Sequence, residues 1–389
     1  MMSGAKKMVP KRRFKEFLNA GDWEQRKLED VCSYQSSSVT INDIDENGRY
    51  DLYDANSLIG KTNKEFMEKE YITIIKDGAG VGRTRILPKN SMFLGTMGAI
   101  KPKNSCLEFL YQLVTSANLE KMCTGSTIPH IYFKDYGKLK FYIPSIIEQE
   151  VIGKFFNNLD YVITLHQRKL DKLQATKKAL LQEMFPEEGQ DKPKRRFKGF
   201  TDAWEQRKLG DIAAITGGGT PSTNISEYWN GDIDWYSPVE IGENRYVSGS
   251  TRKITKLGLE KSSAKILPVG TVLFTSRAGI GNTAILQVEG CTNQGFQSIT
   301  PNSKELDTYF LYTMTPKLKR YGEVTGAGST FVEVSGKQME LMNLMIPSLE
   351  EQKCVSQLFK VMDDTITLHQ RKLDKLKNLK QAYLNEMFV

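Results

Sequence analysis

Residues 163–173 read ITLHQRKLDKL, and the same eleven letters return unchanged at residues 366–376. A second repeat lies further towards the N-terminus of each copy, because WEQRKL occupies residues 23–28 and again residues 204–209. The two repeats are separated by 203 and 181 residues, so the second copy has gained 22 residues between its matching ends. The interiors between those ends look largely unrelated. The pattern predicts one scaffold, present twice, that holds two different interiors.

Each copy is predicted to contain a long helix. Both interiors end in Ile-Pro-Ser, and the serines Ser145 and Ser348 are followed three residues later by Glu148 and Glu351. This is the spacing of a capping box at the start of a helix. Residues 146–185 contain no proline and a single glycine. Forty helical residues span about 60 Å.

The second half of each predicted helix has a heptad pattern with polar insertions, which is typical of a coiled coil. Its partner helix is predicted to be the other copy in the same chain. An antiparallel pairing is expected, with a pseudo-two-fold axis that places one interior at each end. The predicted seam consists of Leu159, Ile163, His166, Leu170 and Leu173 in the first copy, and Met362, Ile366, His369, Leu373 and Leu376 in the second.

The polar seam positions have two interpretations. His166, His369, Lys177 and Lys380 could enforce the register and orientation of the helices, or they could simply record a recent duplication. The divergence of the interiors favours the first interpretation. The seam from Leu159 to Met184 spans about 39 Å, close to the ~34–36 Å between two sites one turn apart on B-DNA.

The interiors are rich in β-branched and aromatic residues and are punctuated by turn formers, which favours short strands. The predicted fold class is therefore α/β (α+β): two mixed α/β domains joined by two long antiparallel coiled-coil helices. The expected boundaries are 1–145 for the first domain, 146–186 for its helix, 187–194 for a linker, 195–348 for the second domain and 349–389 for its helix.

The amino-acid composition excludes few classes of function, and it is consistent with a polyanionic partner. Lys and Arg number 54 against 46 Asp and Glu, a formal net charge of +8. The five cysteines are scattered with no C-x-x-C pair, which predicts reduced thiols and no thiolate metal site. No apolar run approaches the length of a membrane span or a signal peptide. A cytoplasmic protein is expected.

The order and duplication of these motifs resemble the DNA specificity subunit of type I restriction-modification systems. The resemblance rests on the repeated WEQRKL, the repeated Ile-Pro-Ser-x-x-Glu-Gln and the turn GGGTPST at residues 217–223. It covers essentially the whole chain. The turn occurs in the second interior only, and residues 35–40 (QSSSVT) lie near the equivalent place in the first. The two domains therefore look like different recognition subtypes.

The resemblance implies a non-catalytic subunit with two target-recognition domains, each reading one half of a bipartite, asymmetric double-stranded DNA site. The helices would set the spacer. Expected partners are two methyltransferase subunits and two restriction/translocase subunits, which would hold S-adenosylmethionine, ATP and Mg²⁺. The chain itself is expected to bind no cofactor and no metal. The resemblance further implies that the N-terminal segment, with Phe14 and Phe17, packs near the second helix.

Arg277 is the leading candidate for contact with DNA. Both interiors carry a glycine-rich turn after a strand-like run, at residues 78–83 and 277–282. The turn could be mistaken for a nucleotide-binding loop, but it lacks a clear βαβ setting and an acidic partner. It could be an ordinary strand turn or a loop that faces DNA. Arginine can bind guanine or phosphate with two hydrogen bonds.

Other candidates come from matching places in the two interiors. Asn and Gln suit adenine, hydroxyls and cations suit phosphate, and for each the bland alternative of a turn or a solvated side chain remains open. Residues 124–127 match residues 328–330 near the end of each interior. The candidate DNA-contacting residues are Lys76, Arg83, Thr96, Lys101, Thr127, Gly219, Thr220, Ser222, Arg252, Lys253, Arg277, Asn282, Asn293 and Gln294.

An enzyme would need chemistry that the sequence does not display. There is no Asn/Asp-Pro-Pro-Tyr/Phe tetrapeptide for amino-methylation, no Walker loop, and only three histidines. A DNA-binding regulator without enzymatic partners stays open, whereas a purely structural adaptor would leave two divergent domains unexplained.

Overall fold

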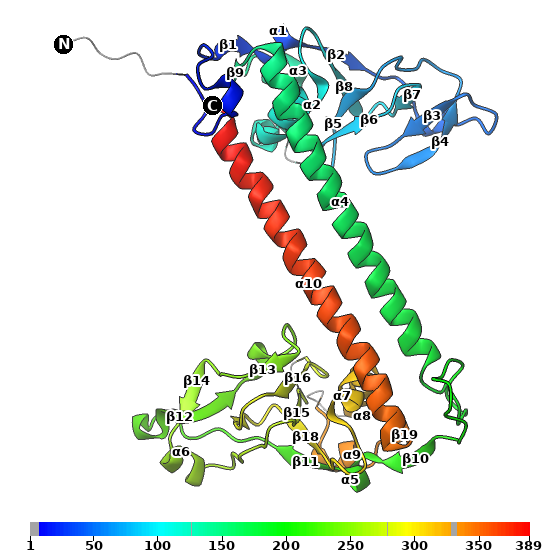
Figure 1. The fold of residues 1–389 in the computed structure, drawn as a ribbon, viewed down its shortest axis with the longest axis vertical. Helices are drawn as coiled ribbons and strands as arrows, with labels where there is room; N and C mark the ends of the chain where they lie inside the picture. The colour runs from blue at the N-terminus through cyan, green and yellow to red at the C-terminus, as the bar shows by residue number, and fades with distance from the viewer. Residues whose placement is uncertain (1–7, 126, 278, 328–332) are drawn as a thin grey trace. The chain divides into compact units, whose positions relative to one another are not determined.

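The chain divides into two compact units in the computed structural model, which describes residues 8–389 except 126, 278 and 328–332 (Figure 1). The first unit is Met1–Lys169 with His369–Val389, and the second is Leu170–Leu368. Each unit contains one mixed α/β domain and a part of both long helices, α4 (Ile146–Glu183) and α10 (Leu349–Met387).

Helices α4 and α10 pack together and run antiparallel within each unit. In the first unit, Asp160 contacts Lys380 at 2.7 Å, and further along α4 the Nδ1 atoms of His166 and His369 lie 3.4 Å apart. In the second unit, Lys177 contacts Asp363 at 2.5 Å. The two units thus repeat one ion pair with the roles of the helices exchanged. The expected pairing direction is confirmed.

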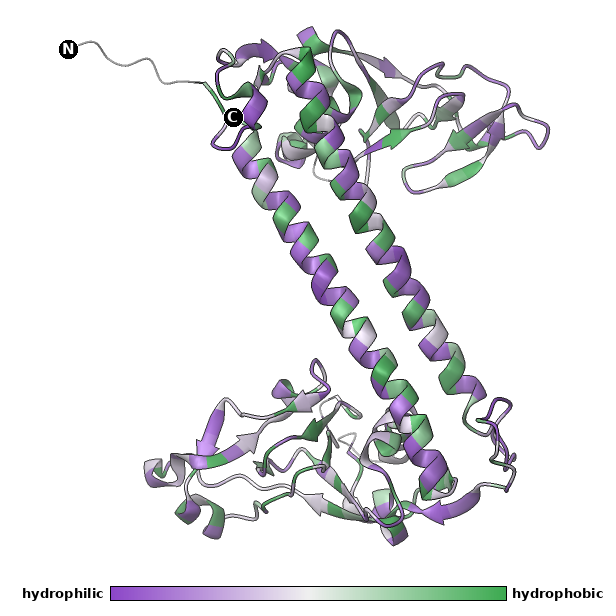
Figure 2. Cartoon of the chain, in the orientation of Figure 1, coloured by the Kyte–Doolittle hydropathy of each residue, from purple (hydrophilic) through white to green (hydrophobic). Residues whose placement is uncertain are grey.

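The burial of side chains along both helices follows the expected heptad pattern. Polar and apolar residues alternate along α4 and α10 in Figure 2. Leu170, His369 and Leu373 are buried. The other predicted seam residues are half-buried, namely Leu159, Ile163, His166, Leu173, Met362, Ile366 and Leu376.

The first domain contains two small sheets. The larger has the strand order β2-β8-β5-β6 and is antiparallel, and in the smaller one β7 lies parallel to β3. Helix α2 (Leu107–Ser116) contacts the larger sheet, and both supply residues to one buried core. The strands are β2 (Cys32–Ser36), β3 (Tyr50–Tyr53), β4 (Leu58–Thr62), β5 (Tyr71–Ile75), β6 (Thr84–Leu87), β7 (Ser91–Phe93) and β8 (Met97–Pro102).

The second domain repeats this topology. Its larger sheet has the order β11-β18-β15-β16 with β13 added at the edge, and its smaller sheet has β17 parallel to β12. Its helices are α5 (Leu209–Ile212), α6 (Lys256–Glu260), α7 (Thr308–Thr313), α8 (Thr315–Gly326) and α9 (Gly336–Glu340). The strands are β11 (Ala213–Gly217), β12 (Trp229–Tyr236), β13 (Tyr246–Val247), β14 (Arg252–Ile254), β15 (Val272–Phe274), β16 (Thr283–Leu286), β17 (Cys291–Thr292) and β18 (Gln297–Pro301).

The repeated sequence edges form the frame of each domain. In the first, β1 (Glu24–Lys27) pairs antiparallel with β9 (Lys140–Ile143). In the second, β10 (Glu205–Lys208) pairs in the same way with β19 (Asn343–Ile346). Each WEQRKL segment therefore lies beside the strand that leads into a long helix.

The helix starts differ from the expected capping box. The hydroxyls of Ser145 and Ser348 do accept the amides of Glu148 and Glu351, at 3.4 Å in both cases. The carboxylate of Glu351, however, takes two hydrogen bonds from Arg196, both 2.7 Å, instead of reaching back to the cap. Glu148 is bound by Arg13 in the same way. A buried carboxylate is better satisfied by a bidentate guanidinium than by one amide.

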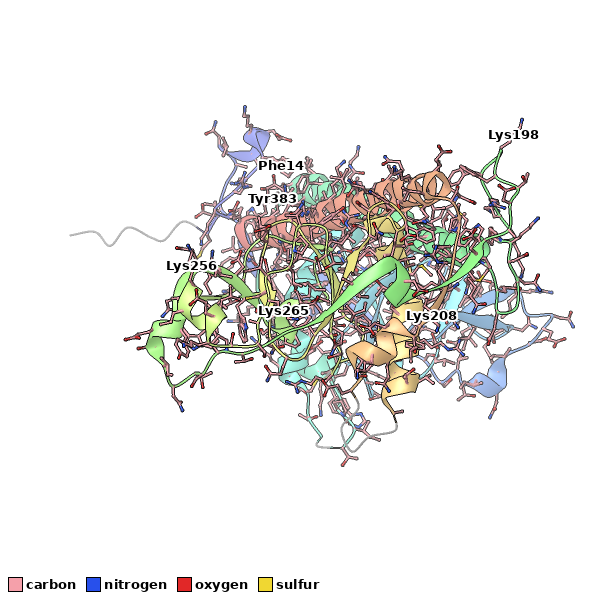
Figure 3. The ribbon with its side chains drawn as sticks, turned by 90° about the horizontal axis from the view of Figure 1, so that it is seen from below. Phe14, Lys198, Lys208, Lys256, Lys265 and Tyr383 are labelled. Atoms are coloured by element: carbon pink, nitrogen blue, oxygen red, sulfur yellow. The ribbon has the colours of Figure 1, made fainter. Side chains whose placement is uncertain are left out.

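The first unit is closed by segments from opposite ends of the sequence. The amide of Arg12 donates to the carbonyl of Glu386 at 2.9 Å. Phe14 packs edge-on against Phe155, in a core that also includes Tyr383; Phe14 and Tyr383 lie near each other in Figure 3. In the second unit the equivalent contact, from Arg195 to Glu183 at 2.8 Å, is made across the continuous linker.

Candidate nucleic-acid interface

The glycine-rich segments are tight turns between antiparallel strands in both domains. The amide of Ile75 donates to Arg83 across the first turn, and Thr275 donates to Asn282 across the second, both at 3.0 Å. Gly80 and Gly279 have positive φ angles, which side chains with a Cβ rarely adopt. Because each turn joins two strands and opens no helix, its geometry differs from a dinucleotide-binding loop.

Several candidates of the second domain come together beside its turn. Ser276, next to Arg277, donates its amide to Gly295 at 2.8 Å, which places Arg277 beside the segment that holds Asn293 and Gln294. The hydroxyl of Thr220 donates to the side-chain oxygen of Gln294. Thr220 lies more than 50 positions from the other three residues in the sequence, and the fold brings it beside them.

The amides in this group are partly engaged already. The side-chain oxygen of Asn293 accepts the amide of Gly295 at 2.8 Å, and that of Gln294 is taken by Thr220. Bidentate recognition of adenine needs both the oxygen and the nitrogen of an amide. In this conformation each oxygen already accepts one hydrogen bond, whereas neither amide nitrogen has a hydrogen-bond partner among the described residues. Asn282 is exposed and bonds Thr275 through its backbone.

The GGGTPST turn is held by two tryptophans, which sequence reasoning missed. The indole of Trp235 donates to the carbonyl of Gly219 at 2.8 Å, and that of Trp229 donates to Ser222 at 3.1 Å. The Arg252 guanidinium stacks 3.6 Å from the centre of the Trp229 ring. Stacking leaves the edges of a guanidinium open to phosphate. The signal available in sequence was two tryptophans in WNGDIDWY at residues 229–236.

Close packing explains the glycines of that turn. A Cβ at Gly218 would lie 1.9 Å from the carbonyl oxygen of Asn293, and one at Gly219 would lie 2.3 Å from the Ser263 hydroxyl. Only glycine fits at such distances. The turn thus lies against the segment that carries Asn293 on one side and the segment after α6 on the other.

Exposed basic residues surround the same turn. Lys253 is tied to Asp234 at 3.2 Å, so its charge is partly neutralised. Lys256 and Lys265, both labelled in Figure 3, are exposed. Lys265 follows Ala264, whose amide lies beside Gly219.

In the first domain, Lys76 and Thr96 come together, and His130 joins them. The amide of Lys76 donates to Thr96 at 3.0 Å, and the carbonyl of Lys76 accepts the amide of Ile131. His130 Nδ1 lies 2.7 Å from a carboxylate oxygen of Asp77. Thr127 is exposed in the loop before His130. The matching residues 328–330 of the second domain lie outside the described residues.

Two candidates of the first domain do not join this group. Arg83 donates to the carbonyl of Ala55 at 2.6 Å and to the side chain of Asn56 at 2.7 Å, so it supports a neighbouring loop. Lys101 donates to Gln35 at 2.8 Å, on the pair β2–β8.

The two domains present different side chains at one shared position. The backbone pairs Asp77 with His130 in the first domain and Arg277 with Glu333 in the second. Equivalent hydrogen bonds flank both pairs, from Lys76 and from Ser276. A carboxylate beside an imidazole in one domain therefore corresponds to an arginine beside a carboxylate in the other.

A family model described as "Type I restriction modification DNA specificity domain" matches residues 20–175 and again 201–378. The chain belongs to this family. The specificity subunits that make up the family recognise the DNA target of a type I system and are not catalytic.

Three similar proteins illustrate the range within this family. The MjaIX specificity subunit of Methanocaldococcus jannaschii is 35% identical over 189 residues, 48% of this chain and 44% of that protein. The MjaVIII specificity subunit of the same organism is 22% identical over 395 residues, 94% of this chain and 91% of that protein. The crystal structure of a type I S subunit from M. genitalium has a TM-score of 0.70 at 16% identity, covering 98% of this chain and 99% of that one.

The length matched therefore differs between relatives of the specificity family. The chain spans less than half of the MjaIX subunit but nearly all of the MjaVIII subunit. The M. genitalium structure shows that the fold of two mixed α/β domains with packed long helices, expected from the sequence, is the fold of this chain.

Nothing in the described part of this specificity-family chain points to a catalytic or metal centre. Among the described residues, no cluster of three or more His, Cys, Asp or Glu side chains could hold a metal ion. Burial raises the pKa of the Cys32 and Cys291 thiols to about 12 each, so both stay protonated. In the described part of the chain, no helix is both long enough and apolar enough to span a bilayer.

Proposed function

We propose that this chain reads a bipartite, asymmetric double-stranded DNA sequence, with one half assigned to each domain. The paired helices α4 and α10 would fix the number of unread base pairs between the halves. The chain would supply sequence recognition only, in a complex whose other subunits perform the reaction.

The observation that carries this proposal is the shared position occupied by Asp77 and His130 in one domain and by Arg277 and Glu333 in the other. The frames and the strand order match, whereas the functional groups at this edge differ in charge. Base pairs differ in the donors, acceptors and methyl groups at their edges, so different side chains are needed to read them. Two scaffolds of equal topology with different groups therefore suit two different half-sites.

The contacts to DNA are proposed in two classes. The residues proposed to read bases are Arg277, Asn293 and Gln294 in the second domain, and Asp77 and His130 in the first. The proposed phosphate contacts are Lys76, Thr96, Thr127, Thr220, Ser222, Arg252, Lys256 and Lys265, all of which are exposed or half-exposed. We assign Arg83, Lys101 and Gly219 to support of the loops.

We propose two methyltransferase subunits and two restriction/translocase subunits as partners. S-adenosylmethionine, ATP and Mg²⁺ would be held in those subunits. Exposed charges occur twice on the helices, in the same sequence context, and would dock two copies of one partner: Arg168, Lys169 and Lys172 on α4, and Arg371, Lys372 and Lys375 on α10. A cytoplasmic location fits this role.

The decisive experiment maps methylated adenines in a genome. The chain is expressed with its methyltransferase subunit in a host that lacks adenine methylation, and the modified positions are read by sequencing. One bipartite motif with a fixed spacer is expected, and it should disappear when this chain is omitted. A continuous motif, or methylation that persists without the chain, would refute the proposal.

A solitary DNA-binding regulator is the alternative. It would purify without methyltransferase subunits, whereas a 2:1 ratio of methyltransferase to this chain is expected here. Reversing all six charges named above should abolish that association. If the association survives, the proposed docking surface is wrong.

A further inference from the structure

One aspartate in each unit joins three elements of the structure. Asp363 lies on α10 with 15% of its side chain exposed. One carboxylate oxygen contacts Lys177 on α4, and the other accepts a hydrogen bond at 2.8 Å from the hydroxyl of Tyr309 on α7. A single carboxylate thus binds the partner helix and the α/β domain at once.

The domain side of this junction is reinforced by an arginine. Arg245 lies just before β13, donates to the Tyr309 hydroxyl at 2.7 Å and pairs with Asp364 on α10. Burial lowers the pKa of Arg245, but its hydrogen bonds to Tyr309 and Asp364 raise the pKa by more than burial lowers it. The guanidinium therefore stays charged. The junction therefore ties the edge strand of the larger sheet to the helix as well.

The first unit repeats the junction with different side chains. Asp160 on α4 accepts a hydrogen bond at 2.9 Å from Gln112 on α2 and pairs with Lys380 on α10. Gln112 is 1% exposed. Asp160 and Asp363 lie 203 residues apart, the offset of the helix repeat, so the same position of each helix holds its own domain.

Near its start, α10 makes further polar contacts with the domain, such as the amide of Asp307 donating to Gln352 at 2.9 Å. The rest of the contact includes apolar packing, as in the core that contains Phe310 and Phe359. Such packing is not directional and tolerates small rotations. Charge-assisted hydrogen bonds have preferred lengths and angles, so they select one setting among those that the packing allows.

We infer that Asp160 and Asp363 are positioning residues, each of which fixes the angular setting of its own domain on the helix pair. This inference rests on the proposed function and adds to it. The aspartates determine how strictly the complex prefers one spacer length, whereas residues at the edge of each domain determine which bases are recognised. Loosening one junction should relax the spacer requirement without changing the half-site sequence.

The test uses the complex of the full chain with its methyltransferase subunits and the mapped target DNA. Tyr309→Phe removes only the hydroxyl that binds Asp363, and Asp363→Asn weakens both arms of the junction. Tyr312→Phe is the matched control on the same helix, because no hydrogen bond of its hydroxyl occurs among the described residues. The ratio of affinities is measured for the native spacer and for spacers one base pair longer or shorter.

The ratio is expected to fall by about tenfold in Tyr309→Phe and in Asp363→Asn, which corresponds to the loss of one charge-assisted hydrogen bond. Tyr312→Phe should keep the wild-type ratio. Binding to DNA that carries only the second half-site should stay within about twofold in all three proteins. Circular dichroism establishes whether each variant is folded. If Asp363→Asn does not fold, the result for the more conservative Tyr309→Phe decides the test.

A wild-type ratio in Tyr309→Phe would overturn the inference, as would a loss of half-site binding with the ratio intact. If the wild-type complex itself shows no spacer preference, the proposed function fails and the inference fails with it. If the wild type discriminates and Tyr309→Phe does so equally, only the inference fails.

Discussion

Arg277 is the residue whose replacement should change DNA binding most specifically. Its place matches that of Asp77 in the first domain, and among the described residues no side chain forms a hydrogen bond or ion pair with it. Arg277→Met should weaken binding to the target. If Arg277 contacts phosphate, the salt dependence, as log K against log[salt], should become shallower by about 0.9; if it contacts a base, discrimination at one position should relax.

Lys304→Met provides the comparison for Arg277→Met, since Lys304 is an exposed cation of the same domain outside the candidate group. Fluorescence anisotropy at several salt concentrations separates the two outcomes. Equal effects of the two substitutions would show that only net charge matters.

Gly219→Ala should destabilise the second domain. The added methyl group would lie 2.4 Å from the amide of Ala264, so the GGGTPST turn must move. Overpacking of this kind costs about 1–3 kcal/mol. Gly249→Ala, where no atom lies within 4 Å of the new methyl group, should leave the urea midpoint unchanged. If both variants unfold alike, the turn is looser than its contacts indicate.

At this scale the sequence gives residue types but not their neighbours. Asn293 and Gln294 were recognisable as candidates because amides suit base edges. Their engagement with Gly295 and Thr220 was not, since Thr220 is 74 positions away from Gln294. The stack of Arg252 on Trp229 was missed for the same reason: a strand pairing between β12 and β14 creates it.

The helix starts contain the ion pairs that most affect the stability of an element. Arg196 and Glu351 are 14% and 1% exposed, and the hydrogen bond to Glu351 raises the pKa of Arg196. Arg196→Met would leave a buried carboxylate without its partner, at a cost of about 3–5 kcal/mol. Urea unfolding measures this loss.

Two further variants test the cause of that loss. Arg196→Met combined with Glu351→Met should recover most of the stability, because no charge remains buried. Lys194→Met, at the exposed pair with Glu187, should change it by less than about 1 kcal/mol. A double variant as unstable as the single one would assign the loss to packing.

The histidines of the helix seam predict a pH effect on stability. Burial lowers the pKa of His369, and the charges of Lys169, His166 and Lys372 lower it further. The unfolded chain then binds a proton more readily than the folded one. Stability should therefore fall as the pH drops below about 6.5, the ordinary pKa of histidine, until the folded pKa is passed.

Replacing the histidine isolates this contribution. In His369→Gln, the decrease in melting temperature between pH 7.5 and pH 5.5 should be smaller than in the wild type, because carboxylates contribute equally to both proteins. An equal decrease in the two proteins would show that His369 does not cause it.

Whole elements were predictable where the sequence repeats itself or follows a strict period. Helix α4 ends at Glu183, close to the expected boundary at residue 186, because a heptad pattern and a proline mark its extent. The larger sheets were expected only as short strands, since their order depends on pairings such as β5 with β8. The displaced capping box shows tertiary contacts overriding a local signal.

For the whole molecule, the separation of frame and interior predicts exchangeable specificity. Replacing residues 29–142 by the interior of another family member should change one half of the methylated motif and preserve the other half and the spacer. Strand β1 and helix α4 remain in place, and the new interior would bring its own strand in place of residues 140–142 of β9, so it should be accommodated. Sequencing of methylated DNA reports both halves, and a change in both would show that the domains do not read independently.

The way the two units are built decides when each can complete its core during synthesis. The second unit is one uninterrupted stretch, so the segments that form its core are made one after another. The first unit lacks His369–Val389 until translation has passed those residues. Trp23 and Phe109 cannot form their ring contacts with Phe388 before then. The domain encoded first thus keeps its core incomplete until the segment His369–Val389 arrives, and apolar surface left exposed in this way favours aggregation.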